Sequence, residues 1–394
     1  MALPRLDILI YAHDGRGLGH ASRSIGIGLA LRRIYPDLKV LFISGCQISR
    51  ELIGSAPLDW LKLPSYETEV INGKSRGIDG QSNFTDKQLG EIRSETLRHI
   101  IELYQPRIVL ADHSPQGKHK ELRGALEETT KTDTKWVLGI RGVIGAVPQV
   151  RSTLACELFE KYYSALLWYG DSSVLGNENM KQLQNQFGIS PVECGYVSRL
   201  TEIHKQQRKK LSTDVDLAGT VSIPWLGEST FDFIVELAEA LRLLGASHGK
   251  WQIFIGVEEG SKDDIKIHSL FQDLDHCSIE IPSSRYNDAL VNSKCALIYG
   301  GYNSLMDILH LGIPCVVLVR KMQDKEQDIH LRQLLMKTGN QLLVFRENDL
   351  NHDELFAALK NQILAPRQKE KTINLNGAAM AADHLFRLLG NKNP

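Results

Sequence analysis

Short apolar segments alternate with longer amphipathic segments along almost the whole chain. This alternation is typical of β-α-β units, in which buried parallel strands are joined by helices that cover the sheet. The expected strands are 7–11, 40–44, 108–111, 135–139, 165–169, 217–221, 251–255, 278–281, 296–299 and 315–319. The expected helices include 22–33, 86–104, 231–244, 302–311 and 324–337. The pattern therefore predicts an α/β protein with doubly wound parallel sheets.

A polar segment with a basic run divides this pattern into two similar halves. It spans 200–212, and we interpret it as a solvated connector. The chain has 394 residues, which is enough for two domains. We expect an amino-terminal domain over 1–200 and a carboxyl-terminal domain over 213–365. Two such domains facing each other form a cleft, and ligands bind beyond the carboxyl ends of the strands.

Composition and charge narrow the class of protein. Lys and Arg number 46 against 47 Asp and Glu, and the charges divide evenly between the halves. A nucleic-acid-binding protein normally concentrates basic charge in one region, so no nucleic-acid partner is expected. No apolar run approaches the ~20 residues that span a bilayer, and the first residues lead directly into a strand without the features of a signal peptide. The six cysteines are scattered, which favours free thiols in the cytoplasm.

The first glycine-rich motif, Asp14 to His20, lies between the first expected strand and the helix after it. Its spacing is not the dinucleotide fingerprint, because His20 and Ser22 stand where that pattern needs glycine. No phosphate-binding Walker motif is present either. A histidine at the positive end of a helix stays neutral and can accept a proton. His20 is therefore a candidate base, the alternative being a histidine that caps the helix or packs inside.

The second motif runs from Gly300 and Gly301 through Asn303 and Ser304 to Asp307. It predicts a strand, a glycine turn and a helix whose first amides can bind phosphate oxygens. Asp307 lies three residues beyond Ser304, on the same helical face, where a carboxylate can bind a ribose diol. The alternative is an ordinary turn before an acidic helix.

Polar residues that follow the expected strand 315–319 are also placed to touch a ligand. Arg320 closes this strand, and a polar segment containing Gln327 comes after it. Two Asp-x-Asp triplets, 214–216 and 273–275, resemble cation ligands, but we interpret them as coincidental and expect no metal or cofactor.

These motifs together resemble a known group of proteins. Gly17, Gly19, His20 and Arg23, with the Gly-Gly-Tyr-Asn-Ser turn at 300–304, resemble the predicted glycosyltransferases related to the peptidoglycan N-acetylglucosaminyltransferase. Further similar stretches lie at 112–117, 139–141, 195–199, 326–327 and 376–378, so the resemblance covers nearly the whole chain. It implies the GT-B fold, with two Rossmann-like domains, the acceptor mainly in the first and a nucleotide-sugar donor in the second.

The resemblance also implies roles for individual residues. His20 matches a histidine proposed at the catalytic centre, and Ser304 and Asp307 match a Thr and a Glu of the donor site. Gln327 matches a glutamine near the donor sugar. The remaining substrate-binding candidates are Gly17, Gly19, Arg23, Gly300, Gly301, Asn303 and Arg320. The expected activity is metal-independent transfer of a sugar from a nucleoside diphosphate sugar to an unknown acceptor, at a membrane surface if that acceptor is a lipid.

The terminal helix, 377–390, carries an apolar stripe and follows a polar segment that begins with a proline break. By resemblance we expect this helix to return to the first domain rather than cover its own.

Two other functions stay open. Nucleotide-sugar hydrolases of the pseudaminic-acid pathway are similar around Gly17, Gly19, His20 and Arg23, and there the histidine would activate water. A non-catalytic protein that binds sugar nucleotides is the second alternative. Replacing His20 separates these alternatives, because an enzyme would lose turnover and keep donor affinity.

Overall fold

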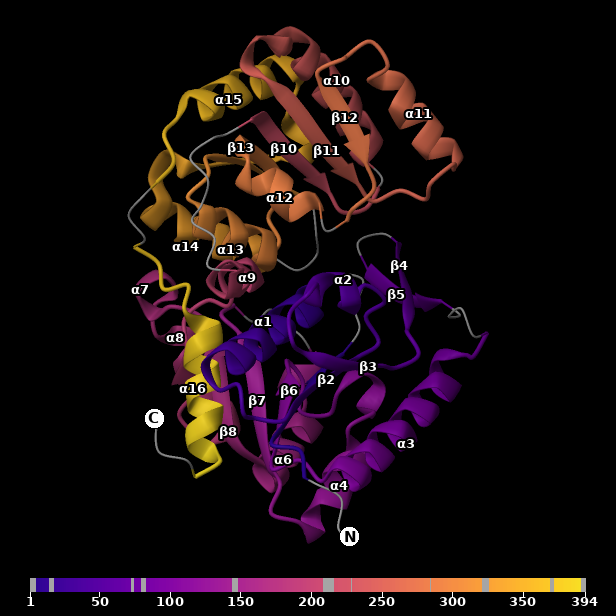
Figure 1. Cartoon of the computed structure of the whole chain (residues 1–394), viewed down its shortest axis with the longest axis vertical. Coiled ribbons are helices and arrows are strands. Elements are labelled where there is room, and N and C mark those ends of the chain that lie inside the picture. The colour runs from indigo at the N-terminus through magenta and orange to yellow at the C-terminus, as the bar shows by residue number, and fades with distance from the viewer. Residues whose placement is uncertain are drawn as a thin grey trace. The chain divides into compact units, whose positions relative to one another are not determined.

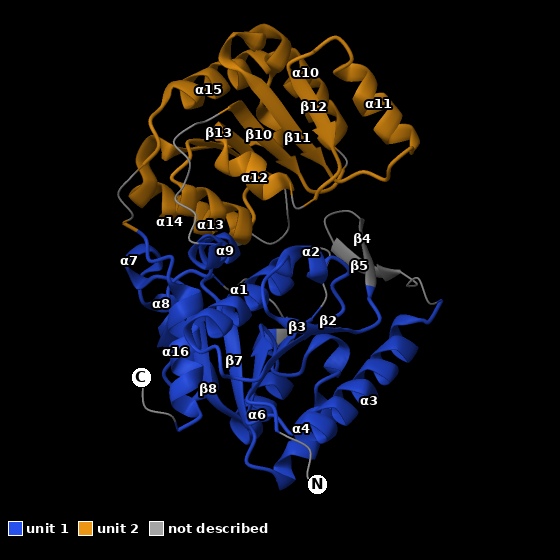
Figure 2. Cartoon of the chain, in the orientation of Figure 1, with its two compact units in different colours: residues 1–208, 323–326, 373–394 blue, residues 209–322, 327–372 orange. Residues whose placement is uncertain are grey.

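The computed structural model describes residues 5–13, 18–71, 74–78, 83–143, 148–207, 216–227, 229–283, 285–320, 326–368 and 372–390. Of residues 67–71, 74–78, 148, 149 and 326 it describes the backbone alone. The chain divides into two compact units, which Figures 1 and 2 show in the same orientation. Unit 1 comprises 1–208, 323–326 and 373–394, and unit 2 comprises 209–322 and 327–372. Gly17, one of the predicted binding residues, lies outside the described residues.

Unit 1 is built on a parallel sheet whose seven described strands run in the order β3-β2-β1-β6-β7-β8-β9. These strands are β1 (Ile8–Ala12), β2 (Val40–Ser44), β3 (Asp59–Lys62), β6 (Ile108–Asp112), β7 (Lys135–Arg141), β8 (Tyr163–Tyr169) and β9 (Val192–Glu193). Every residue of β1, β2 and β6 is buried, as continuous apolar runs in a parallel sheet require. A separate antiparallel hairpin consists of β4 (Glu67–Ile71) and β5 (Lys74–Ile78).

The helices of unit 1 connect these strands. They are α1 (Gly19–Ile34), α2 (Ser49–Ile53), α3 (Asp86–Tyr104), α4 (Arg123–Glu128), α5 (Pro148–Arg151), α6 (Thr153–Tyr162), α7 (Ser172–Leu175), α8 (Glu178–Phe187), α9 (Arg199–Gln207) and α16 (Gly377–Leu388). Helix α1 begins three residues earlier than the sequence pattern suggested, so His20 lies in its first turn.

Unit 2 repeats the same plan. Its six described strands form a parallel sheet in the order β12-β11-β10-β13-β14-β15. They are β10 (Leu217–Ile223), β11 (Lys250–Ile255), β12 (Cys277–Glu280), β13 (Ser293–Tyr299), β14 (Cys315–Val319) and β15 (Leu342–Arg346). The helices are α10 (Thr230–Leu244), α11 (Lys262–Leu270), α12 (Arg285–Val291), α13 (Tyr302–Leu311), α14 (Glu326–Thr338) and α15 (His352–Leu364). The predicted α/β class with two doubly wound parallel sheets is confirmed.

The expected polar connector at 200–212 is helical over its first half. Helix α9 spans Arg199–Gln207 and buries Glu202, which accepts hydrogen bonds from Arg33 and Lys205. The interpretation of this part as a solvated connector was therefore wrong, because the paired Glu202 ties the helix to α1. Within the described part of the chain, no helix combines the length and the apolar character needed to cross a membrane.

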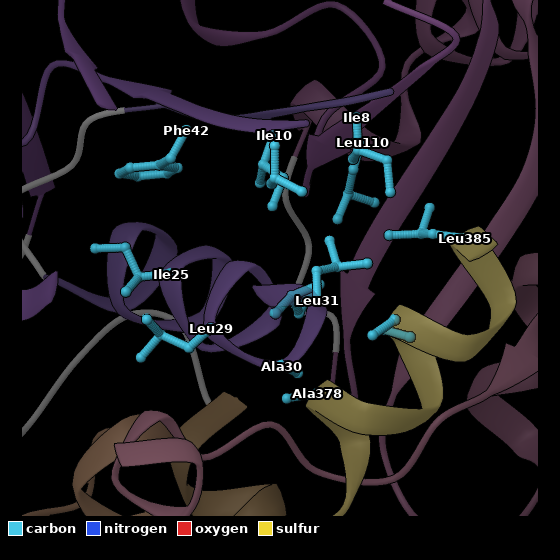
Figure 3. Packing of buried hydrophobic residues seen from close by; sticks show 14 of the residues in the cluster. Ile8, Ile10, Ile25, Leu29, Ala30, Leu31, Phe42, Leu110, Ala378 and Leu385 are labelled. Atoms are coloured by element: carbon cyan, nitrogen blue, oxygen red, sulfur yellow. The ribbon is translucent and has the colours of Figure 1, made fainter. Parts of the chain in front are cut away.

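Helix α16, from the carboxyl end of the chain, packs within unit 1. Its apolar stripe enters the cluster that also holds residues of β1, β6 and α1, and Figure 3 shows Leu385 of α16 in that cluster with Leu31 and Leu110. The start of the helix fits closely against the segment after β9. A Cβ at Gly377 would lie 2.6 Å from the carbonyl carbon of Tyr196, so glycine is needed for this approach.

Truncating Leu385 to Ala is expected to lower the free energy of unfolding of unit 1 by about 2–5 kcal/mol, because the side chain is fully buried. Urea unfolding would measure this loss. Met380→Ala on the exposed side of the same helix is the matched control, with an expected change within about 0.5 kcal/mol. Equal effects of the two substitutions would contradict the packing described above.

Candidate functional site

Each sheet has a position at which the order of its strands reverses. In unit 1 the chain moves from β1 to β2 and β3 on one side and then returns to β6 on the other side of β1. In unit 2 the same reversal separates β10 from β13. Loops diverge at such positions, and the carboxyl ends of the two strands there are the usual place for a ligand. Gly19, His20 and Arg23 lie at the first of these places, and the segment from Gly300 to Asp307 follows β13 at the second.

In unit 1 the reversal brings His20 and Asp112 together. His20 lies in the first turn of α1, and Asp112 is the last residue of β6. The Nδ1 atom of His20 contacts Oδ2 of Asp112. Arg23, one helical turn after His20, donates to the same carboxylate from Nε at 3.1 Å and from Nη2 at 2.8 and 2.9 Å. Asp112 and Arg23 are almost completely buried, whereas the His20 side chain is 18 % exposed.

The hydrogen bonds fix the tautomer of His20. An ionised carboxylate can only accept, so the Nδ1 atom of His20 carries the hydrogen that faces Asp112. The 3.3 Å approach between Nδ1 and Nη2 of Arg23 is then a close contact between two donors. Nε2 of His20 is left with its lone pair. This arrangement, an imidazole oriented by a buried carboxylate, is the geometry of a general base.

Burial keeps the imidazole neutral. It lowers the pKa of His20 to about 3, with a further lowering from the nearby His13, while Asp112 opposes the change. The helix end that sequence reasoning invoked is thus not the main cause. The unfolded chain takes up this proton near pH 6.5, so acid favours unfolding between that pH and about pH 3.

The charge of Asp112 is stabilised by its neighbours. Burial by itself would raise the pKa of Asp112, but the positive Arg23 and the hydrogen bond from His20 hold that pKa below its usual range. Arg23 therefore neutralises the carboxylate that orients His20. Because that charge is already compensated, Asp112 directs the imidazole ring without turning it into a permanent cation.

Two further histidines surround His20. The ring centroids of His13 and His20 lie 3.9 Å apart, and those of His113 and His20 lie 5.2 Å apart. His113 is buried and adopts a left-handed backbone conformation with φ of 69°. Burial and the nearby Arg141, at the end of β7, lower the pKa of His113 well below its usual value. Its Nδ1 atom meets no hydrogen-bond partner among the described residues.

In unit 2 the glycine turn begins α13 as predicted. Gly300 is buried, and a Cβ there would lie 2.9 Å from Cδ1 of Leu331, so this glycine serves packing. A Cβ at Gly301 would meet no described atom within 4 Å. Gly301 is the residue before the helix, and no described side chain caps the amides that follow. Asn303 and Ser304 are partly exposed in this first turn, which can bind an anion.

Asp307 lies one turn further along α13 and is 7 % exposed. The second turn of the helix faces the interior of unit 2, where residues 305–311 are buried. The hydroxyl of Tyr286 in α12 is buried, and its pKa is raised, first by this burial and then by the negative charge of Asp307. Asp307 is therefore a largely buried carboxylate in the second turn of α13.

Arg320 occupies a largely buried network rather than an open surface. Its guanidinium carbon lies 3.9 Å from the ring centroid of Tyr299 and 4.4 Å from that of Trp225. Its Nε atom lies 3.4 Å from Oε2 of Glu347, and Oε1 of the same carboxylate accepts hydrogen bonds from Tyr299 and Thr230. Its Nη1 atom is buried and has no hydrogen-bond acceptor among the described residues. A phosphate contact by Arg320 stays a prediction.

Of the remaining candidates, Gly19 begins α1 beside His20, and Gln327 is partly exposed in the first turn of α14. The structure adds residues to which sequence reasoning assigned no role: His13, Asp112, His113, Arg141 and Glu347. Asp112, His13 and Arg141 share one signal, since each ends or follows a buried strand at the edge where ligands bind. Glu347 has no sequence feature of this kind. In the described ranges, no cluster of three or more His, Cys, Asp or Glu side chains could hold a metal ion.

Comparison with known proteins identifies the fold. No protein-family model and no curated protein sequence match the chain. Solved structures match it over nearly its whole length. The UDP-GlcNAc 2-epimerase of Methanocaldococcus jannaschii has a TM-score of 0.62 at 11 % identity, with 97 % of this chain and 100 % of that chain covered. MurG of Acinetobacter baumannii has a TM-score of 0.51 at 9 % identity, with 98 % and 99 % covered.

A third similar structure, MnaA of Staphylococcus aureus with UDP, has a TM-score of 0.58 at 10 % identity and 99 % of both chains covered. Identities this low establish the fold alone. They confirm the predicted GT-B fold of two Rossmann-like domains.

Proposed function

We propose that this chain is a glycosyltransferase that moves a sugar from a nucleoside diphosphate sugar to an acceptor hydroxyl or amine, without a metal ion. The observation that carries the proposal is the contact between His20 and Asp112 at the strand reversal of unit 1. A neutral, oriented imidazole with an unprotonated Nε2 is suited to remove a proton from an acceptor. The fold supports a nucleotide sugar as donor, since the similar epimerase and MnaA structures are named for UDP-GlcNAc or UDP.

In this proposal unit 1 supplies the base and unit 2 holds the donor. Nε2 of His20 takes the proton of the acceptor hydroxyl, whose oxygen forms the new bond to the anomeric carbon. The bond between that carbon and the diphosphate oxygen breaks, and the nucleoside diphosphate leaves with the electron pair. The amides at Gly301, Asn303 and Ser304 stabilise the negative charge that develops on it. Proton removal of this kind contributes about 10²–10⁴-fold to the rate.

The other assignments complete the donor site. Asp307 binds the ribose, and Arg320 and Gln327 contact phosphate or sugar. Gly19 and Arg23 shape the acceptor side around His20. All six cysteines are free in the structure, which fits the cytoplasm proposed for this enzyme.

Nucleotide binding tests the donor site. UDP should raise the melting temperature of the protein, since a ligand that binds only the folded state stabilises it. The Asp307→Ala variant should lose most of that rise, measured by thermal shift and by isothermal titration with UDP. Asp353→Ala is the matched control, because this side chain is 82 % exposed on α15. Unchanged UDP affinity in the Asp307 variant would refute its assignment.

Chelation tests the absence of a metal. Release of nucleoside diphosphate from the donor should continue at the same rate in excess EDTA, because the first turn of α13 stabilises the leaving group. The triplet at 273–275 offers little to a cation, since Asp273 accepts two hydrogen bonds from Arg242. Loss of activity in EDTA with recovery on adding Mg²⁺ or Mn²⁺ would overturn this part of the proposal.

His20 and Asp112 could equally activate a water molecule, and one assay separates sugar transfer from hydrolysis. Donor turnover is measured with and without a panel of acceptor alcohols and amines. A transferase releases nucleoside diphosphate faster when its acceptor is present and forms a glycosylated product. Full-rate release in water, with no acceptor dependence and no product, would identify a hydrolase instead.

A further inference from the structure

The chain makes a strained turn at His113, directly after β6. The amide of Ser114 donates to the carbonyl oxygen of Asp112 at 2.9 Å, and φ of His113 is 69°. A γ-turn with a positive φ is rare and strained in a residue that carries a side chain. The amide of His113 also donates to the carbonyl oxygen of Gly139 at 2.7 Å, and this bond fixes the turn to β7.

The turn brings two successive side chains to the same place. In a regular strand, neighbouring side chains point to opposite faces of the sheet. Here Asp112 contacts His20, and the ring of His113 also lies beside His20, with 5.2 Å between the ring centroids. The strained turn thus places a second imidazole next to the candidate base.

Packing alone does not account for a histidine at position 113. The residue is 5 % exposed, yet its Nδ1 atom has no hydrogen-bond partner among the described residues. A buried polar atom without a partner costs stability, and so does a left-handed conformation in a residue other than glycine. An apolar side chain would avoid the first cost, and glycine would avoid the second. A ligand that hydrogen-bonds to the ring would supply the missing partner.

The charge state of the His113 ring indicates which group it can bind. Burial lowers the pKa of His113 well below its usual value, and the nearby Arg141 lowers it further. The ring is therefore neutral, with one nitrogen that donates a hydrogen bond and one that accepts. A hydroxyl group both donates and accepts, whereas a phosphate or a carboxylate only accepts. The chemistry of the ring thus favours an uncharged hydroxyl.

This hydroxyl differs from the one that is attacked in the proposed reaction. There, Nε2 of His20 takes the proton, and a lone pair of the same oxygen forms the new bond. A hydrogen bond donated to that oxygen would make its lone pairs less reactive. A hydroxyl on the adjacent carbon is within reach, because the two rings lie 5.2 Å apart and each hydrogen bond spans about 3 Å.

Resting on the proposed role of His20 as the base, we propose that His113 binds a second hydroxyl of the acceptor, on the carbon next to the one that is glycosylated. The acceptor is then a vicinal diol, a group that carbohydrates carry. Nδ1 of His113 receives the hydrogen bond of this second hydroxyl, and the bond holds the first hydroxyl against Nε2 of His20. In this role His113 determines which acceptors are used.

NMR of ¹³Cε1-labelled histidines in the full chain tests this contact without requiring activity. Methyl glycosides are titrated into the protein in the presence of UDP, and each is compared with its monodeoxy analogues. A methyl glycoside should shift the His113 signal, and at least one of its analogues should leave that signal in place.

Signals in this experiment are assigned with the variants His113→Gly and His20→Gln. His99 is the internal control, because its side chain is 64 % exposed on α3 and should not respond. If no glycoside moves the His113 signal, or if every analogue moves it equally, the proposal is overturned.

Kinetics test the consequence for acceptor choice. In the wild-type protein, removing the neighbouring hydroxyl should lower kcat/KM for the acceptor by about 10- to 100-fold, since Nδ1 of His113 is again left without a partner. The His113→Phe variant should use the glycoside and this analogue at similar rates. His113→Gly serves if that variant does not fold, because glycine accepts the left-handed turn.

The matched control is His99→Phe, which should discriminate between the two acceptors as the wild-type protein does. A His113 variant that is slower with both acceptors and keeps the discrimination would show a merely structural role and overturn the proposal. If no acceptor changes donor turnover, the proposed transfer function fails, and the NMR titration still decides whether His113 binds the diol.

Discussion

His20→Gln is expected to lower kcat/KM for release of nucleoside diphosphate by about 10²–10⁴-fold and to leave the affinity for UDP unchanged. Glutamine keeps a polar side chain of similar size beside Asp112, so the buried carboxylate stays hydrogen-bonded. It cannot accept the acceptor proton, because an amide is far less basic than an imidazole. The measurement is steady-state release of nucleoside diphosphate, with UDP titration by calorimetry alongside.

The control for this prediction is His99→Gln, on the exposed face of α3, which should behave as the wild-type protein. A variant at position 20 that keeps full turnover would remove His20 from the mechanism. If donor affinity falls in parallel with turnover, His20 contributes to donor binding rather than to proton transfer. The assignment of the base to unit 1 and of the donor to unit 2 would then be wrong.

Arg23→Leu is expected to lower the free energy of unfolding by about 3–5 kcal/mol, because it leaves the Asp112 carboxylate buried without its cation. Urea unfolding at pH 7, followed by far-UV circular dichroism, measures the loss. Arg242→Leu is the matched control. It breaks an exposed ion pair with Asp273 and should change the stability by no more than about 1 kcal/mol.

The free energy of unfolding lost in the Arg23→Leu variant is expected to depend on pH, and the direction of this dependence follows from the pKa of Asp112. In the wild-type protein the pKa of Asp112 lies below its usual value, so the stabilisation is complete above about pH 4 and disappears as the pH falls through the lower, folded-state pKa. In the variant the cation is absent and the pKa of Asp112 rises. The difference in stability between the two proteins should therefore be largest at neutral pH and shrink in acid. A deficit that is constant with pH would mean that packing, not charge, is lost.

Much of the candidate donor region was predictable because its signals are local. The turn at Gly300 and Gly301 and the helix that follows occupy neighbouring positions, and the boundaries predicted for that helix, 302–311, are those of α13. The depth of Asp307 was not predictable, since the same helical face could have pointed to solvent or to the core. Only the packing of α13 against its sheet decided that the second turn is buried.

The candidate base, His20, was also predictable only in part from the sequence. A histidine after alternating glycines singled out His20, yet its partner lies 92 positions away. Asp112 appeared in the sequence only as the polar end of an apolar strand. Pairing of β1 with β6 brings the two together, and the contact of His13 depends on the same pairing. Nothing in the spacing of these residues along the chain indicates that contact.

The sequence by itself determined the class of fold, the presence of two similar halves and the position of the glycine turn at Gly300 and Gly301. These follow from hydrophobic periodicity and backbone freedom, which act between residues a few positions apart. Only the tertiary structure decided which strand ends become neighbours, how the charge of Asp112 is compensated, and that α16 packs beside α1. Such properties depend on contacts between distant segments and on the burial that those contacts create, and burial is what sets the protonation state of His20.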